Sequence, residues 1–450
     1  MYQDKSIERK KQENEQISEG LAKSCGQFLK ALMVDLDKKL DRRLLKTLRD
    51  LVLIIIIHRH RNNGLLLSEL GGYLMGAHRA PAGTKRIAAL LHSKKWGQEA
   101  IEEFLWKRGN EKVYEVMGPD SDPYVIWDES VLEKPESLKA EGLCAVISSK
   151  AKRLKRIRPG FFNPPGGRPI CGPGFHWLQI LVLGMKGAPT LAHWRCWTTR
   201  GERETNKRAE EAQILQKVAQ LWGMDVVHIW DRGFAGSPWV SLALHYHLRF
   251  IVRWQKNYKL VGPDGEAKKA WQITRGKRSL DHRLIYDCKR HCERKTGIFV
   301  VPVHLPGSSF PLWLVVSRPG PGKQPWYLLT SDPIDSLEDA WRTVFAYNRR
   351  WQVEMSLRFD KSELAFESPR LQKWEVRMKF IAIALLAHAF MIQLLSPRAL
   401  LTRNWLLSFW CHRTGKRSRF TSAPLYRLRF ALSLLWLYFR PPCLPLLISG

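Results

Sequence analysis

Tyr347, Arg350, Glu354 and Lys361 carry four chemically different polar side chains at helical spacing. At about 100° per residue on an α-helix, these positions fall within one stripe roughly 60° wide. Apolar residues that point away from this stripe and would anchor the helix are Val344, Val353 and Leu357. A phenol, a guanidinium, a carboxylate and an ammonium on one stripe predict a site where a metal-binding carboxylate lies beside phosphate-binding cations.

Asp128 and Asp231 each follow an apolar run with the pattern of a buried strand, at 124–127 and 226–230. Further strands are predicted at 175–183 and 190–197, and a helix at 202–222. This order of elements predicts a mixed α/β sheet, in which ligands gather at strand ends. An aspartate at a strand end is more often a turn or cap residue, and Asp120 and Asp122 lie close to Asp128.

Together with Glu354, the two aspartates give three carboxylates on separate elements. Hard oxygen ligands of this kind suit two Mg²⁺ ions that also take phosphate oxygens from a substrate. The three acids therefore predict two-metal phosphoryl transfer. The alternative for Glu354 is a place among surface ion pairs, because arginines surround it.

The remaining chain divides into regions of different pattern. Residues 1–118 read as an amphipathic helix, a buried apolar turn and several short basic helices, which predict either a helix-turn-helix-like DNA contact or a plain helical cap. Residues 119–245 hold the first part of the mixed sheet. Residues 246–335 alternate apolar and polar positions between glycine-proline turns, which predicts a β-rich insertion. A second part of the core at 336–398 and a basic, apolar tail at 399–450 follow.

The chain has 450 residues and a formal net charge of +31, with a pI of about 10.0. This excess favours nucleic acid as the partner, because cationic side chains release counterions from phosphates. An anionic membrane surface and a ribosome-associated role remain as alternatives. Basic runs that would follow a DNA backbone lie at 150–158, with Lys152, Arg153, Lys155 and Arg156, and at 413–419.

Localisation is predicted to be cytoplasmic and nucleoid-associated, with no membrane partner. The first residues are polar and no secretory signal follows them. The apolar runs at 51–57 and 380–395 are shorter than a typical membrane span and are predicted to be buried helices. The eight cysteines are scattered, so neither a disulfide framework nor a zinc site around His291 is predicted.

The spacing Tyr347-x₂-Arg350-x₃-Glu354-x₆-Lys361 resembles the Y-R-E-K signature of DDE transposases of the insertion-sequence-four type. The run Asp231-Arg232-Gly233-Phe234 is similar to the second-aspartate motif of that family, and Asp128-Glu129-Ser130 is similar to the first. The resemblance extends over roughly residues 60 to 430.

This resemblance implies an RNase H-like catalytic core with a β-rich insertion, flanked by a helical N-terminal DNA-binding region and a helical C-terminal region. It implies Asp128, Asp231 and Glu354 as catalytic metal ligands for two Mg²⁺ ions, with Mn²⁺ as a substitute. Tyr347, Arg350 and Lys361 would contact phosphates, and Trp326 would stack on a flipped base.

The activity implied is cut-and-paste transposition of an insertion sequence, by end nicking, hairpin formation and strand transfer. The partners implied are double-stranded DNA, as terminal inverted repeats and target, and a second copy of the chain on that DNA, with no small-molecule substrate. Two alternatives remain open: an inactive transposase-derived DNA-binding protein, and a general RNase H-like nuclease.

Overall fold

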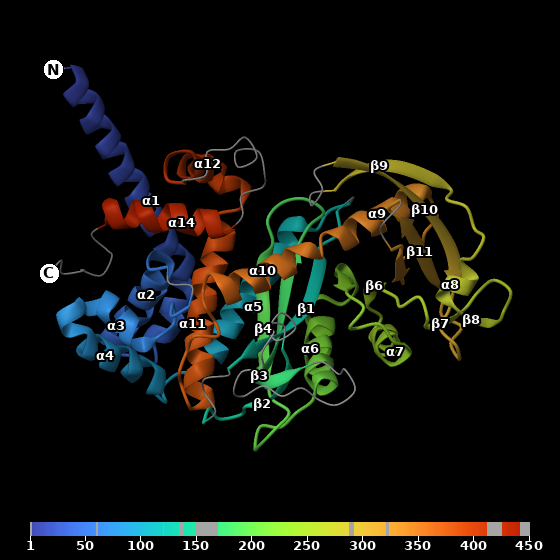
Figure 1. Cartoon of the computed structure of the whole chain (residues 1–450), viewed down its shortest axis with the longest axis horizontal. Coiled ribbons are helices and arrows are strands. Elements are labelled where there is room, and N and C mark those ends of the chain that lie inside the picture. Colours follow the sequence, from blue (N-terminus) through green and yellow to red (C-terminus); the bar gives the residue numbers. More distant parts are fainter. Residues whose placement is uncertain are drawn as a thin grey trace.

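The computed structural model describes residues 2–59, 62–119, 121–134, 139–148, 170–287, 292–320, 324–411 and 425–441. Helices from both ends of the chain gather at one end of the molecule, and a strand-rich region forms the other end (Figure 1). A large mixed sheet connects the two, which confirms the predicted α/β class at this level.

The first part of the sheet contains six strands, of which the short strand β2 lies at its edge. They are β1 (Tyr124–Glu133), β2 (Cys144–Ile147), β3 (Cys171–Leu183), β4 (Thr190–Trp197), β5 (Val227–Trp230) and β6 (Arg249–Arg253). β1 pairs antiparallel with β3, which pairs antiparallel with β4 and β2. On its other side β1 pairs parallel with β5, and β5 pairs parallel with β6. The parallel connections pass through α6 (Lys207–Trp222), η3 (Gly223–Asp225) and α7 (Ser237–His245).

The predicted strands at 175–183, 190–197 and 226–230 are present, and three details of the prediction are wrong. Strand β1 continues past Asp128 to Glu133, because β3 is long enough to pair with it throughout. Helix α6 begins at Lys207, where Asn206 caps it by accepting from the amide of Ala209 at 3.0 Å. Strand β2 was not predicted, since its four residues show only a short alternation.

The strand-rich segment predicted after residue 246 is confirmed as secondary structure. It contains β7 (Lys259–Val261), β8 (Ala267–Lys269), α8 (Ala270–Ile273), β9 (Asp281–Asp287), β10 (Cys292–Val303), β11 (Leu312–Arg318) and β12 (Trp326–Thr330). Strand β12 pairs antiparallel with β6, so most of this segment extends the first sheet. Strand β6 lies beyond the predicted boundary at 246 but pairs with β5, within the core.

The two faces of the sheet are covered by different helices. Val125 and Trp127 of β1 join a core cluster with α6 and α7, whereas Tyr124 and Ile126 join a second cluster with α9 (Leu337–Asn348), α10 (Trp351–Ser362) and α11 (Trp374–Gln393). Side chains alternate along a strand. Asp128 is therefore directed to the face that α10 covers.

The helical end of the molecule combines elements from both ends of the sequence. They are α1 (Tyr2–Asp37), α2 (Arg42–Ile57), α3 (Leu67–Met75), η1 (Ala77–Arg79), α4 (Ala80–His92), α5 (Glu99–Val116), η4 (Pro397–Ala399), α12 (Leu400–Phe409) and α14 (Leu425–Tyr438). The apolar run at 51–57 is the buried second half of α2, and most of the run at 380–395 lies in the buried helix α11, so the prediction that both are buried helices is confirmed. Within the described residues, no single helix is long and apolar enough to span a membrane, although α11 and the bent segment after it pass such a test together.

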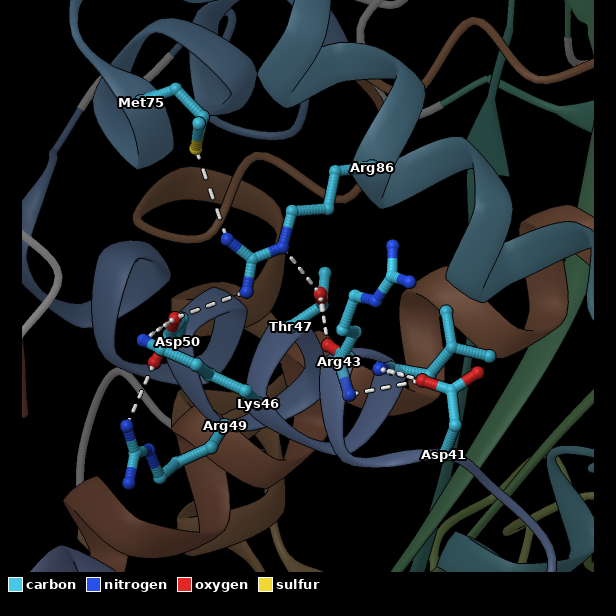
Figure 2. Close-up of polar contacts among 9 residues, drawn as sticks. Asp41, Arg43, Lys46, Thr47, Arg49, Asp50, Met75 and Arg86 are labelled. Atoms are coloured by element: carbon cyan, nitrogen blue, oxygen red, sulfur yellow. Dashed lines mark hydrogen bonds and ion pairs between the residues drawn. The ribbon is translucent and has the colours of Figure 1, made fainter.

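A buried carboxylate connects α2 to α4 (Figure 2). Asp50 is 1% exposed and lies 2.8 Å from Lys46 Nζ, 3.2 Å from Arg49 Nη2 and 3.7 Å from Arg86 Nη2. Arg86 also donates to the Thr47 hydroxyl at 2.8 Å. Arg86, which lies on one of the short basic helices predicted to contact DNA, thus helps to neutralise Asp50.

Candidate active site

The Y-R-E-K residues do not share one continuous helix, contrary to the prediction. Tyr347 lies in the last turn of α9, Arg350 is the N-cap of α10, and Glu354 and Lys361 lie within α10. Arg349 and Arg350 keep helical backbone angles at the break, with φ of −63° and −53°. The chain therefore changes helix without a wide loop, and α10 continues from α9 across the sheet (Figure 1).

Arg350 joins the carboxylates of two elements. Its Nη1 lies 3.4 Å from Asp128 Oδ2, and its Nη2 pairs with Glu354 Oε1. The Arg350 and Asp128 side chains are 14% and 15% exposed, and Glu354 is 32% exposed. This pairing places Glu354 of α10 and Asp128 of β1 on opposite sides of one guanidinium.

Asp231 follows the last residue of β5, as predicted. Its Oδ1 accepts a hydrogen bond from the Gly233 amide at 2.6 Å, which orients the carboxylate in the turn after the strand. Because β5 is parallel to β1 and pairs with it, Asp231 and Asp128 lie at the same level along two neighbouring strands.

The electrostatics of Asp128 reflect this clustering of acids. Burial raises the pKa of Asp128 from 3.8 to about 6; the Arg350 guanidinium opposes this shift, and the Asp231 charge adds to it. Burial is the largest cause, so the pKa of Asp128 is raised even though the Arg350 guanidinium faces the carboxylate.

A second acidic cluster, which was not predicted from the sequence, lies beside Asp128. Lys207 of α6 pairs with Glu129 and lies 3.5 Å from Glu211, and Arg208 lies 2.7 Å from Glu211. Burial and the nearby Glu129 together raise the pKa of the fully buried Glu211 to about 8, against the charges of Lys207 and Arg208. Arg208 also donates to the Gly233 carbonyl at 3.3 Å, so α6 supports the turn that carries Asp231.

Tyr347 and Trp326 lie against each other next to this site. Their ring centroids are 5.1 Å apart at an interplanar angle of 70°, and Arg253 of β6 lies 5.9 Å from the Trp326 ring. Tyr347 is 3% exposed, and its hydroxyl makes no hydrogen bond of good geometry within the described residues. Burial raises the pKa of this phenol, against the charges of Arg350 and Arg253. The phenol is therefore a hydrogen-bond donor at neutral pH.

The other predicted DNA contacts are placed only in part. Lys361 lies in the last turn of α10 and is half-buried. Lys152, Arg153, Lys155 and Arg156, and the basic run at 413–419, lie outside the described residues.

The three predicted metal ligands fit hard cations in type, since carboxylate oxygens are what Mg²⁺ binds. In the described part of the chain, however, no three acidic, histidine or cysteine side chains approach closely enough to hold one metal ion. Arg350 lies between Asp128 and Glu354 instead. Metal binding at these acids thus requires Arg350 to change its pairing.

Comparisons with known proteins give limited information. No protein-family profile and no curated protein sequence matches this chain. Among solved structures, a cryo-EM structure of a piggyBac transposase synaptic complex with hairpin DNA aligns with 97% of this chain and 86% of that one. The TM-score is 0.41 and the sequence identity 14%, a likeness too low to establish a shared fold or function.

Proposed function

We propose that this protein is a DDE transposase that moves an insertion sequence by metal-dependent cutting and joining of DNA. The observation that carries this proposal is the meeting of three elements, β1, β5 and α10, beside the carboxyl end of β5. Asp128 of β1 and Asp231 after β5 lie on neighbouring parallel strands, and Arg350 holds Glu354 of α10 against Asp128.

The strand arrangement supports an RNase H-like core for this activity. In the order β4, β3, β1, β5, β6, the first three strands are antiparallel and the last two join in parallel through helices. The β-rich segment enters after β6 and ends before α9, so it is inserted between Asp231 and Glu354.

Asp128, Asp231 and Glu354 would hold two Mg²⁺ ions, with Mn²⁺ as a substitute. When bound, the ions would supply an activated oxygen nucleophile and stabilisation of the leaving 3′-oxygen. Arg350 and Lys361 would bind the phosphates on either side of the scissile bond, the arginine through its planar fork. Tyr347 would donate a hydrogen bond to a phosphate, and Trp326 would stack on a base displaced during hairpin formation.

The proposed partners are terminal inverted repeats, target DNA and a second copy of the chain, in a cytoplasmic, nucleoid-associated complex. Exposed apolar side chains on α12 and α14 support a self-association surface: Leu401 is 84% exposed, Phe409 71% and Tyr438 72%. We expect two protein copies per complex on paired ends, measured by sedimentation of the protein–DNA complex. A single copy on each cleavage-competent complex would contradict this expectation.

The proposal is tested with a duplex that carries the inverted repeat flanking the reading frame, beside a shuffled duplex of equal length. Wild-type protein is expected to nick the repeat duplex in Mg²⁺ or Mn²⁺, and to leave it intact in EDTA. Equal cutting of both duplexes would indicate a general RNase H-like nuclease. A bound but uncut repeat duplex in both metals would indicate an inactive DNA-binding protein.

A further inference from the structure

A network of buried polar side chains joins the sheet to α10 and α11 behind the candidate site. Gln179 of β3 donates to Asp360 Oδ2 at 2.5 Å and accepts from the Ser356 hydroxyl at 2.9 Å. His388 Nδ1 of α11 lies 2.7 Å from Asp360 Oδ1. Gln179, Asp360 and His388 are each 0% exposed. Polar groups this deeply buried are costly unless they are paired, so their contacts define one arrangement of the three elements.

This network lies directly beside the proposed metal ligands. Gln179 is the cross-strand partner of Asp128 in the β1–β3 register. Both side chains are directed to the face of the sheet that α10 covers, because Trp177 and Ile126, two residues before each, belong to the core cluster on that face. Gln179 therefore connects the strand position of Asp128 to the helix that carries Glu354.

Ser356 and Asp360 are four residues apart on α10 and so share one side of the helix. Glu354 lies at the margin of the buried side, since Val353 and Leu357 on its flank are 0% and 6% exposed. On a helix with a side-chain radius of about 5–6 Å, a rotation of about 10° would move the Glu354 carboxylate by about 1 Å. The contacts of Ser356 and Asp360 with Gln179 oppose such a rotation.

We propose that Gln179 and Asp360 are positioning residues that set the rotation of α10, with His388 holding Asp360 from α11. Through them, the rotation of α10 sets the direction of the Glu354 carboxylate, which Arg350 joins to Asp128. This inference rests on the proposed function for its catalytic consequence, but the restraint on α10 is a property of the folded protein alone. Neither residue touches the proposed substrate.

The test compares Gln179→Leu and Ser356→Ala with Asp360→Asn and a control, Thr274→Val. An asparagine at 360 can still accept from Gln179, and its amide can donate to His388 Nδ1 once the ring takes the tautomer with its proton on Nε2, so the network is retained. Thr274 is 3% exposed and donates to the Ala270 carbonyl at 3.0 Å in the insertion, so its loss removes a buried hydrogen bond far from α10 in the fold. Each full-length variant is measured by hydrogen exchange of peptides from α10 and α6, by DNA binding in EDTA, and by single-turnover cleavage in Mg²⁺.

For Gln179→Leu, exchange in α10 is expected to rise while exchange in α6 stays unchanged, and affinity for the repeat duplex is expected to stay within about twofold of wild type. Cleavage is expected to slow about 100-fold, the cost of a misplacement of about 1 Å at a reacting centre. Ser356→Ala removes only one contact of the network, so it tests the inference even if Gln179→Leu does not fold. Its cleavage rate is expected to fall about tenfold, because a smaller misplacement of Glu354 costs less. Asp360→Asn is expected to keep both α10 exchange and cleavage near their wild-type values.

Unchanged exchange in α10, or wild-type cleavage despite faster exchange, would overturn the inference. Equal slowing by Thr274→Val would do the same, since that result would reflect general destabilisation. If the wild-type protein cleaves no DNA, the proposed function fails, and exchange in α10 still decides whether the network restrains this helix.

Discussion

Asp128→Asn is expected to make the protein more stable at pH 7 while abolishing its DNA cleavage. The pKa of Asp128 is about 6 in the folded protein, against 3.8 for an ordinary aspartate. A raised carboxyl pKa means that the folded state binds more protons than the unfolded state between these values. The free energy of unfolding of the wild type therefore falls as the pH rises from about 4 to about 6, and stays lowered above that.

The asparagine variant lacks this penalty because its side chain carries no charge. The free energy of unfolding of the variant should equal that of the wild type near pH 4 and exceed it by about 1–3 kcal/mol at pH 7. This difference already includes the loss of the ion pair between residue 128 and Arg350. Thermal unfolding midpoints of both proteins at pH 4.5 and pH 7 measure this difference. A midpoint at pH 7 equal to or below that of the wild type would contradict the raised pKa.

Cleavage by Asp128→Asn should fall by about 1000-fold or more, because an amide is a poor ligand for a hard cation and the site loses one of three carboxylates. The matched control is Asp122→Asn, six residues earlier. Asp122 pairs with Arg249 at 2.9 Å, away from α10. Lost cleavage in Asp122→Asn with retained cleavage in Asp128→Asn would mean that the first catalytic aspartate is misassigned.

Gly83→Ala is expected to destabilise the helical N-terminal region by about 2–3 kcal/mol, the upper part of the range for an overpacked core. A Cβ added at Gly83 of α4 would lie 2.1 Å from the Gly71 carbonyl oxygen of α3. That neighbour is backbone, so α3 and α4 must separate to admit the methyl group. The helix-forming advantage of alanine, about 1 kcal/mol, is too small to offset this separation.

Gly20→Ala in α1 is the matched control, because no atom lies within 4 Å of its added Cβ. It should be neutral or stabilising by up to about 1 kcal/mol. Thermal unfolding and proteolysis near residue 76 measure both variants. Equal behaviour of the two would show that α3 and α4 are not in the close contact described.

The extent to which sequence predicted this structure differs between its parts. Buried apolar runs such as the one ending at Trp230 predict strands well, because a strand with both faces covered needs apolar residues at every position. The end of β1 was predicted wrongly, since Glu129 and Ser130 look like loop residues and are held in the strand by pairing with β3. The break between α9 and α10 at Arg349 could not be predicted, because no glycine or proline marks it and both arginines keep helical backbone angles.

The candidate site shows the same division. The spacing of Glu354 and Arg350 could be found by pattern, because both belong to one short segment. The network of Gln179, Asp360 and His388 could not, because its members come from β3, α10 and α11 and become neighbours only through tertiary packing. Arg350 was predicted as a phosphate ligand. An ion pair between Glu354 and a neighbouring arginine was the alternative prediction, and the structure contains it, whereas the pairing of Arg350 with Asp128 was not predicted.

The hydrogen bonding of β12 to β6 has a consequence for thermal motion. Trp326 begins β12, β12 pairs with β6, and β6 pairs with β5, which ends next to Asp231. Two ladders of backbone hydrogen bonds thus connect the tryptophan to the aspartate, with no flexible tether between them. Fluctuations in their separation are those of neighbouring strands within one sheet, so a base held by Trp326 would vibrate together with the carboxylates instead of drifting relative to them.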